Sequence, residues 1–411
     1  MNPKLYFLAL FFLCLILLVR MFTFFASNKP YFPNSFVSVE ATLSDQPKLA
    51  ADGQKVSINL PNAQRVSVKF EAAPILSYGD RIKFEGKISY FKTDKGNEVA
   101  YMTYPKFKII EKGENSLIVN VRENIIHIFN SSLGNREAAL MLGIVFGIKE
   151  QMPDEFYSQL QKTGVLHVIA ASGMNITMVG GFLISIFSLF FKRQFALSLT
   201  IVGILLYSLL AGFEASIVRA AIMGILVFGA QILGRQQSAS IGFFTAGFIM
   251  LFVNPTLIND IGFQLSFMAT FGLIYVRPIF ELNKKVKKLI EKTVIGEDVA
   301  TTITAQAVTL PILLGNFGTY GLFSILVNAL VLWTVPIIMI IGGVSAIVGL
   351  LFLPIGKLIS YFSLPFLLYF EKIIGLFSNF GGQISIESLP LTLIGGYYLM
   401  LLSLILYLRK R

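Results

Sequence analysis

Long apolar segments dominate this chain and predict a polytopic α-helical membrane protein. Residues 5–25 are apolar almost without interruption, and similar segments recur from residue 165 onward. A spanning helix needs about 20 apolar residues. The pattern predicts about ten spans, at residues 5–25, 165–191, 195–212, 216–233, 238–253, 261–276, 298–316, 321–353, 358–377 and 391–408. The segment 321–353 is too long for one simple helix, and Pro336 and Gly342-Gly343 predict that it is broken.

Residues 1–26 and 27–116 differ sharply in pattern. No small-residue cleavage site follows the first apolar run, which favours an N-terminal anchor helix over a cleaved signal peptide. Residues 27–116 then alternate apolar and polar positions with the period of two that strands show. Alternating segments begin at Val37, Lys55, Arg65 and Arg81. We expect about five strands in a small all-β domain, whose size suits an oligonucleotide/oligosaccharide-binding (OB) fold.

Residues 117–164 separate the β domain from the polytopic domain, residues 165–411. Short helical patterns in this stretch mix apolar positions with charged ones, and none is long enough to span. Such segments are typical of amphipathic helices that lie along a membrane surface. We therefore expect interfacial helices here.

The composition supports a membrane protein and excludes several kinds of chemistry. Hydrophobic residues make up 55% of the 411 residues and charged residues only 14%, against about 25% in soluble domains. The single cysteine, Cys14, and the two histidines, His127 and His167, exclude a disulfide framework, a zinc ribbon and a histidine-rich metal site. We expect no metal, no cofactor and no enzymatic activity.

Basic residues between the predicted spans give the orientation. If spans alternate strictly, the basic loops fall on one side of the membrane, together with Lys4. They are Lys192-Arg193, Arg235, the stretch from Arg277 to Lys292, Lys357 and the C-terminal Arg409-Lys410-Arg411. The positive-inside rule assigns this side to the cytoplasm. The sequence thus predicts a multi-pass protein of the cytoplasmic membrane, with both termini inside and the β domain outside.

Polar side chains collect in the outer half of the predicted spans, where contact with lipid would be unfavourable. They are His167, Ser172, Asn175, Arg219, Asp260, Gln264, Gln306 and Asn328. Their shared depth predicts a water-filled vestibule that opens outward. Structural alternatives exist: Glu214 or Asp260 could neutralise Arg219, and Asp260 could instead cap its own helix. Gln306 and Asn328 could serve only to connect neighbouring helices by hydrogen bonds.

His167 and Ser172 also raise the question of an intramembrane serine protease. Five positions apart on a regular helix, the two side chains point about 140° apart. The hydroxyl then cannot reach the imidazole, as nucleophilic catalysis requires. Ser172 and Asn175, three positions apart, share a face. We therefore expect polar lining rather than catalysis.

The β domain contains lysines close to aromatic residues, a combination that predicts a face for single-stranded nucleic acid. The candidates are Lys83, Lys87, Tyr90, Lys92, Lys106 and Lys108. The alternative is a solvated, lysine-rich surface over a core of aromatic residues.

Several motifs resemble those of the ComEC competence proteins. The first runs from Gly164 to Asn175 and includes His167, Ser172 and Gly173. Others follow in the order of that family: Val218-Arg219-Ala220-Ala221, Asn254-Pro255, the segment from Asp260 to Phe267, Gln306 with Leu310-Pro311, and Asn328 with Pro336. The resemblance covers residues 35–345, although Met174 and Asn175 replace the commoner Leu-His of the signature.

The resemblance implies a channel that passes one strand of transforming DNA across the cytoplasmic membrane, with an external OB-type domain. It implies single-stranded DNA and membrane lipid as partners, and a separate DNA receptor and nuclease. A separate motor ATPase is also expected, because the chain has no G-x-x-x-x-G-K phosphate loop. Long members carry a C-terminal metallo-β-lactamase-like domain, which we expect to be missing after Arg411.

Two other functions stay open at this point. The chain could transport another anionic polymer or solute, or it could be a membrane-anchored binding or assembly module whose β domain recruits external partners.

Overall fold

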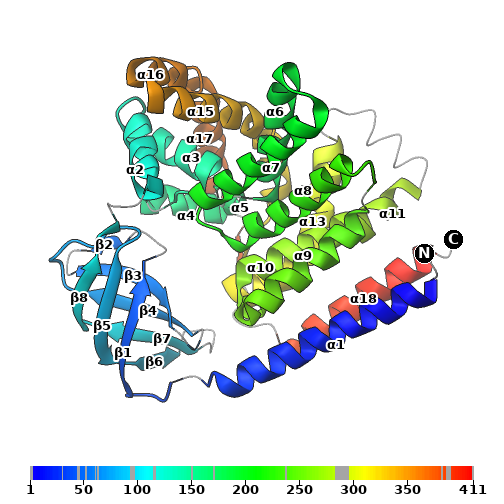
Figure 1. Ribbon diagram of the computed structural model, residues 1–411, viewed down its shortest axis with the longest axis horizontal. Helices are drawn as coiled ribbons and strands as arrows, with labels where there is room; N and C mark the ends of the chain where they lie inside the picture. Colours follow the sequence, from blue (N-terminus) through cyan, green and yellow to red (C-terminus); the bar gives the residue numbers. More distant parts are fainter. Residues whose placement is uncertain are drawn as a thin grey trace. The chain divides into compact units, whose positions relative to one another are not determined.

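The computed structural model describes residues 3–29, 31–43, 47–50, 53–60, 62, 64–92, 98–113, 117–149, 151–169, 172–236, 238–282, 296–380, 383–385 and 390–409 (Figure 1). The chain forms two compact units. The first comprises Met1–Asn124 with Leu251–Thr256, and the second comprises Ile125–Met250 with Leu257–Arg411. Part of the basic stretch from Arg277 to Lys292 lies outside the described residues.

The first unit begins with helix α1 (Pro3–Ser27), and its β domain contains two sheets (Figure 1). The three-stranded sheet has the order β1-β5-β8, with β1 (Phe36–Thr42), β5 (Arg81–Lys87) and β8 (Lys106–Glu111). The five-stranded sheet has the order β2-β3-β4-β7-β6, with β2 (Lys48–Ala50), β3 (Gly53–Asn59), β4 (Arg65–Phe70), β7 (Glu98–Thr103) and β6 (Ser89–Lys92). The paired strands are antiparallel except β4 and β7, which are parallel.

Alternating burial explains why these segments form sheets. β1 buries Val37 and Val39, and β5 buries Ile82 and Phe84, while the residues between them face outward. Phe70 of the other sheet meets Phe84 edge to face, with ring centres 5.8 Å apart. Burying such a side chain contributes about 1.5–3 kcal/mol. The apolar core between the two sheets therefore stabilises the domain.

The number of strands differs from the expectation. The segments predicted from Val37, Lys55, Arg65 and Arg81 are confirmed as β1, β3, β4 and β5. The described part of the domain also contains β2, β6, β7 and β8, which gives eight strands instead of about five, and the OB fold is not confirmed. Strands β2 and β6 have only three and four residues, and an alternation so brief is hard to distinguish from a loop. Strands β7 and β8 have six residues, as many as β4, so their length does not explain why they were missed.

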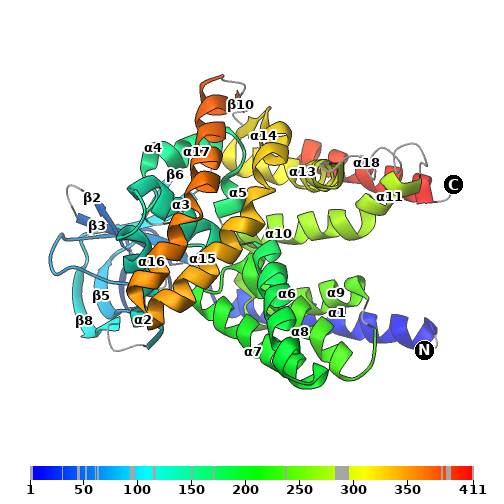
Figure 2. The same cartoon turned by 90° about the horizontal axis from the view of Figure 1, so that it is seen from above.

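Helices form most of the second unit. They are α2 (Leu117–Asn130, which crosses the boundary between the units), α3 (Asn135–Phe146), α4 (Asp154–Lys162), α5 (Leu166–Ile169), α6 (Gly173–Phe190), α7 (Arg193–Leu210), α8 (Ala215–Ile232), α9 (Ala239–Val253), α10 (Ile261–Phe271), α11 (Arg277–Leu282), α13 (Gly296–Phe317), α14 (Ser324–Val331), α15 (Thr334–Leu351), α16 (Leu353–Tyr361), α17 (Leu364–Asn379) and α18 (Leu391–Arg409). Shorter elements are η2 (Pro255–Asn259), the π-helical turn η3 (Gly272–Val276), β9 (Thr319–Gly321) and β10 (Gln383–Ser385). Helices α6, α7 and α8 pack together, and α15 lies beside α16 (Figures 1 and 2).

Five helices of the described chain are long and apolar enough to cross a membrane. They are α6, α7, α8, α15 and the part of α13 from Val299 to Phe317. Helices α16 and α17, bent by 48° at their junction, would make a sixth span. Shorter apolar helices are found at Phe12–Ser27, Ala239–Val253 and Thr392–Tyr407. The prediction of a helical protein with membrane spans is confirmed, whereas the number of ten spans is not.

Helix α3 is enclosed by protein. Its residues from Ala138 to Phe146 are all buried. Gly342 of α15 lies against it, because a Cβ there would come within 2.5 Å of Met141 Sδ and 2.7 Å of Val145. Such small residues allow helices to approach closely. An interfacial position stays a prediction for α2 and α4, but α3 packs inside the helical unit.

Pro336 lies close to the break between α14 and α15. Leu332 and Trp333 separate α14 from α15, and Pro336 lies in the first turn of α15. Proline has no N–H to donate, so it fits the first turn of a helix better than the interior. The predicted break within residues 321–353 is therefore confirmed. Gly342-Gly343, which were also expected to interrupt this segment, lie inside a continuous α15.

Pro311 leaves one backbone carbonyl inside α13 without its helical hydrogen-bond donor. It cannot donate to the carbonyl of Ala307 one turn earlier. The Tyr397 hydroxyl of α18 donates to this carbonyl at 2.5 Å, and Tyr398 donates to the carbonyl of Val308 at 3.1 Å. An unpaired carbonyl is costly where water is absent. The two tyrosine hydroxyls thus hydrogen-bond α18 to the part of α13 where Pro311 removes a backbone N–H donor.

We predict that Tyr397→Phe lowers the stability of the protein by about 1 kcal/mol, because it leaves the Ala307 carbonyl unpaired. Tyr398→Phe is the matched control and should have a smaller effect, since the Val308 carbonyl keeps its regular helical donor. Thermal unfolding of both purified variants in detergent measures the difference. Equal losses would contradict the role assigned to Pro311.

Candidate functional site

Arg219 is a buried cation among apolar helices. It lies in the second turn of α8, and the residue is only 9% exposed. Its Nε donates to Ser266 Oγ at 2.8 Å, and its Nη1 donates to the Thr270 hydroxyl. Ser266 and Thr270 are four positions apart on α10, so they share one face of that helix. The two hydroxyls fix the orientation of the guanidinium.

Neither of the two candidate carboxylates neutralises Arg219. Glu214 Oε1 lies 2.7 Å from Lys149 Nζ. Asp260 Oδ1 accepts from the backbone N–H of Phe263 at 2.8 Å and caps α10. The structural alternative in which Glu214 or Asp260 neutralises Arg219 is therefore wrong, and no other ion pair of Arg219 exists among the residues described. Leaving a buried charge unpaired is strongly destabilising, so intramembrane charges of this kind usually have a function.

The N-terminus of α6 lies against the guanidinium. A Cβ at Gly173, the first residue of α6, would lie 2.8 Å from Arg219 Nη2. Ser172 occupies the N-cap position, but its side chain makes no capping bond, and its Oγ donates to Asn175 Oδ1 at 3.1 Å. The Asn175 amide in turn donates to the carbonyl of Ile144 at 2.7 Å. Ser172 and Asn175 therefore share a face, as their spacing predicts.

His167 does not pair with Ser172. Helix α5 ends at Ile169 before α6 begins, so the two residues are not on one regular helix. No hydrogen bond joins them in the described structure. His167 keeps an exposed surface, and desolvation by the surrounding protein lowers the pKa of its imidazole.

Asp260 and Gln264 form bonds within their own segment. Asp260 is the N-cap of α10, as one of the sequence alternatives proposed. Gln264 Nε2 donates to the carbonyl of Ile258 at 2.8 Å. Both residues keep partial exposure. Their hydrogen bonds stabilise the start of α10, which carries Ser266 and Thr270.

Asp260→Ala should lower stability by about 1 kcal/mol, the usual effect of losing an N-cap. Asp260→Asn should be nearly neutral, because the amide oxygen can still accept from the Phe263 N–H. Thermal unfolding of the two variants in detergent checks this. If Asp260→Asn is as unstable as Asp260→Ala, the charge rather than the cap matters.

Gln306 and Asn328 belong to a second polar group. Gln306 Nε2 donates to Ser324 Oγ at 3.0 Å, and its Oε1 accepts from the Tyr320 hydroxyl at 2.7 Å. These bonds join α13 to α14 and confirm interhelical hydrogen bonding for Gln306. Asn328 lies one turn beyond Ser324 and is buried, and its Oδ1 has no hydrogen-bond partner in the described structure. It does not take part in the bonds that Gln306 makes.

The eight predicted residues thus do not form one hydrogen-bonded cluster, and the bonds described join Ser172 to Asn175 and Gln306 to Ser324 and Tyr320. The sequence pattern did not reveal the residues that hold Arg219. Ser266 and Thr270 supply the hydroxyls, and the sulfur of Met223 lies 3.9 Å from Nη1. The one-turn spacing of the two hydroxyls on a predicted span was a usable signal, since Ser and Thr side chains in membrane helices hydrogen-bond across to neighbouring helices.

The predicted lysines of the β domain lie on the outer face of the three-stranded sheet. Lys83, Lys87, Lys106 and Lys108 are exposed. Lys83 is opposite Lys108, and Lys106 is opposite Glu85. Acidic residues are therefore interspersed with the lysines, and this face has a mixed charge.

Tyr90 and Lys92 are not part of that face. Tyr90 lies on β6 in the other sheet, where its hydroxyl donates to the Tyr31 carbonyl at 2.6 Å and accepts from Gln64 Nε2 at 2.6 Å. Its ring packs against the apolar core, so Tyr90 has a structural role inside the domain. The side chain of Lys92 lies outside the described residues.

The outer face of the five-stranded sheet is a better basic and aromatic surface. Its outward basic residues on β3 and β4 are Lys55, Arg65 and Lys69. Lys69 Nζ lies 5.4 Å from the centre of the Tyr104 ring, and Tyr101 is in contact with the Phe91 ring. The outward positions described on β3, β4 and β7 carry no carboxylate. The sequence did not predict this face, because the pairing of β4 with β7 cannot be seen from either segment alone.

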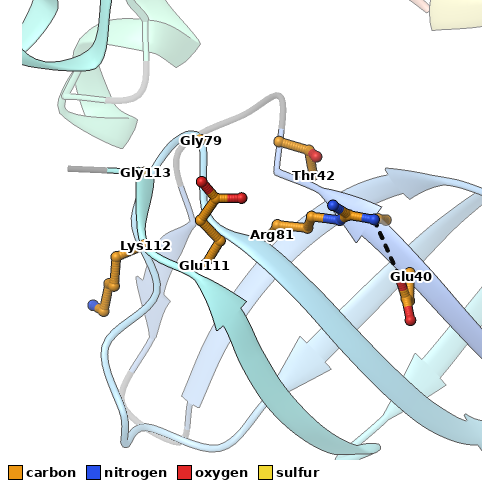
Figure 3. A pocket seen from close by; sticks show the side chains of 8 residues that line it. Glu40, Thr42, Gly79, Arg81, Glu111, Lys112 and Gly113 are labelled. Atoms are coloured by element: carbon orange, nitrogen blue, oxygen red, sulfur yellow. Dashed lines mark hydrogen bonds and ion pairs between the residues drawn. The ribbon is translucent and has the colours of Figure 1, made fainter. Parts of the chain in front are cut away.

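A cavity of about 600 Å³ opens at the end of the three-stranded sheet (Figure 3). Glu40, Arg81, Glu111 and Lys112 contribute to its lining, and Arg81 forms an ion pair with Glu40 at 3.3 Å. Charges of both signs line this cavity, so it shows no preference for an anion.

Comparisons with known proteins agree with the motifs. The chain is 29% identical over 232 residues to ComE operon protein 3 of Bacillus subtilis, a match that covers 56% of this chain and 29% of that protein. It is 31% identical over 137 residues to Recombination protein 2 of Haemophilus influenzae, covering 31% of this chain and 17% of the relative. An uncharacterized protein of Aquifex aeolicus is 25% identical over 355 residues, covering 81% and 82% of the two chains.

The matched region thus spans less than a third of the length of the Bacillus and Haemophilus relatives. No solved structure matches the chain significantly. The sequence model of the competence proteins matches residues 144–411, which is more than half of the chain and includes α6, α8 and α10 with Arg219 and its partners. On this match, and on the apolar helices that carry it, the chain is a membrane protein that belongs to the competence protein family.

Proposed function

We propose that this chain forms a channel for the uptake of single-stranded DNA across the cytoplasmic membrane and performs no catalytic step itself. The observation that carries this proposal is the buried guanidinium of Arg219, which hydroxyls hold in place and no described carboxylate neutralises. A passing anion would compensate its charge. Membership in the competence family favours DNA as that anion.

Phosphate chemistry fits an arginine in this position. Each nucleotide carries one negative charge. A charge inside the membrane is unfavourable, as the insertion cost of about 2.5–3.5 kcal/mol for a charged side chain at the centre of a helix shows. A positive charge along the path lowers the energy barrier for a phosphate that crosses the membrane. The planar guanidinium also presents paired donors that match phosphate oxygens.

The β domain would receive the strand before it enters the membrane. The outer face of the five-stranded sheet offers Lys55, Arg65 and Lys69 for phosphates, with Tyr101 and Tyr104 for stacking. The exposed lysines of the three-stranded sheet lie on the opposite side of the domain and would form a separate contact with the strand. The proposal places the β domain outside and both termini in the cytoplasm, in line with the basic loops. It also needs a separate DNA receptor, nuclease and motor ATPase.

Complementation of a deletion strain tests the proposal. The full chain should restore both transformation and the entry of labelled single-stranded DNA into the cytoplasm. Uptake of labelled inorganic phosphate and small organic anions should not change. Restored uptake of small anions without DNA would instead favour a solute transporter.

A second experiment tests the alternative that the chain is a membrane-anchored assembly module. Residues 1–116, which contain α1 and the β domain, are expressed in the same strain. If the chain is a channel, we expect this fragment to restore no transformation, even when it reaches the membrane. Full restoration by the fragment would contradict the channel, as would normal transformation in the deletion strain itself.

A further inference from the structure

We infer that the N-terminus of α6 and the guanidinium of Arg219 together form a binding site for one phosphate group. The inference rests on the proposed function and deepens it, because it states where a phosphodiester of the strand is held. Two independent features converge on this position.

The first feature is the start of α6. This helix has 18 residues, and the first N–H groups of any helix lack partners within it. Ser172 would normally accept from one of them, but its hydroxyl is bonded to Asn175 at 3.1 Å and makes no cap. The Asn175 N–H donates to the Ser172 carbonyl at 3.1 Å, which leaves the N–H groups of Gly173 and Met174 at the start of the helix. These groups and the positive end of the helix dipole favour an anion. Interrupted membrane helices present their N-termini to anionic substrates in this way, and α6 begins directly after Ser172, whose backbone is extended.

The second feature is the remaining nitrogen of Arg219. Ser266 and Thr270 occupy Nε and Nη1, and Nη2 has no hydrogen-bond partner in the part of the chain described. Nη2 is also the atom that lies next to Gly173 at the start of α6. The residue is nine-tenths buried and carries a charge without a counter-ion among the residues described. Its free donor and the first N–H groups of α6 can therefore bind the same anion.

Gly173 keeps this position open. A Cβ there would lie 2.8 Å from Nη2 and 3.4 Å from the Ala220 Cβ. Any side chain at residue 173 would enter the space between the guanidinium and the end of the helix. Gly181 lies on the same helix, and a Cβ there would have nothing within 4 Å. Gly181→Ala is therefore a matched control for Gly173→Ala.

Phosphate binding to the purified full chain tests the site. The protein is held in a maltoside detergent, which contains no phosphate, and its thermal unfolding is followed as inorganic phosphate replaces chloride at constant ionic strength. We expect phosphate to stabilise the wild-type chain and Gly181→Ala alike. Gly173→Ala and Arg219→Lys should bind at least about tenfold more weakly, because each loses charge-assisted hydrogen bonds.

Two further arms identify the source of the phosphate. A short oligothymidylate should compete with inorganic phosphate if a phosphodiester of DNA is bound. Nanodiscs that contain phosphatidylglycerol should block the phosphate effect only if a lipid headgroup occupies the site. Competition by the oligonucleotide supports the inference, and occupation by the lipid alone overturns its link to DNA.

The inference fails if phosphate does not stabilise the wild-type chain, or if folded Gly173→Ala binds phosphate as the wild type does. Arg219→Lys keeps the test decisive if Gly173→Ala does not fold. Failure here is distinct from failure of the proposed function. The channel would stand if Arg219 were required for DNA uptake while Gly173→Ala left phosphate binding intact.

Discussion

Replacing Arg219 by alanine is expected to abolish transformation, by a factor of about 100 or more, while the protein still inserts into the membrane. The expected factor corresponds to about 3 kcal/mol, the scale for losing one partner of a buried charged contact. The strand loses the cation that compensates its phosphates, whereas the helices lose only bonds to two hydroxyls, Ser266 and Thr270. Transformation frequency, normalised to the amount of protein in the membrane, measures this effect.

Arg219→Lys should lie between the wild type and Arg219→Ala. Lysine keeps the charge but has no planar fork, so it cannot bond Ser266, Thr270 and a phosphate at once. Arg193→Ala is the control, since Arg193 is exposed at the start of α7. Lys192 keeps a positive charge beside it. Wild-type transformation by Arg219→Ala would refute the role proposed for this arginine.

Replacing Gly356 by alanine is expected to cause a large loss of folded protein. Gly356 of α16 lies directly against Gly349 of α15. A Cβ at Gly356 would clash with the Cα of Gly349 and lie 2.7 Å from its backbone nitrogen. It would also lie 2.9 Å from the Ser345 carbonyl oxygen. Backbone atoms cannot rotate away as a side chain can, so the two helices would have to separate.

Overpacking of this kind costs about 1–3 kcal/mol and occasionally more, and the upper end applies because backbone meets backbone. Gly343→Ala is the control on α15, because a Cβ there would have nothing within 4 Å. Alanine also favours a helix over glycine by about 1 kcal/mol. Size-exclusion profiles and thermal unfolding in detergent should show loss of folded protein for Gly356→Ala only. Equal behaviour of the two variants would contradict the close packing of α15 and α16.

These two predictions separate transport from folding. Arg219→Ala should leave the amount of folded protein nearly unchanged and remove activity. Gly356→Ala should reduce activity only as far as it reduces the amount of folded protein. Transformation frequency divided by membrane protein therefore falls in the first variant and stays near the wild-type value in the second.

The amino-acid sequence by itself determined the class of the protein and several local features. Continuous apolar segments predicted spanning helices, because backbone and side chains must both suit lipid. Strict alternation predicted β1, β3, β4 and β5. Spacing placed Ser172 and Asn175 on one face, and Pro336 predicted the break before α15. All of these depend on the period of a single segment or on the chemistry of one residue.

Only the tertiary structure decided which side chains meet. It assigned Asp260 to the cap of α10 and Glu214 to Lys149, which left Arg219 with hydroxyl partners and no carboxylate among the residues described. It also placed Tyr90 and Lys83 in different sheets. The physical reason is that hydrophobic periodicity fixes which face of a helix or strand is buried. It does not fix which neighbour packs there, and the partners of a polar group depend on that neighbour.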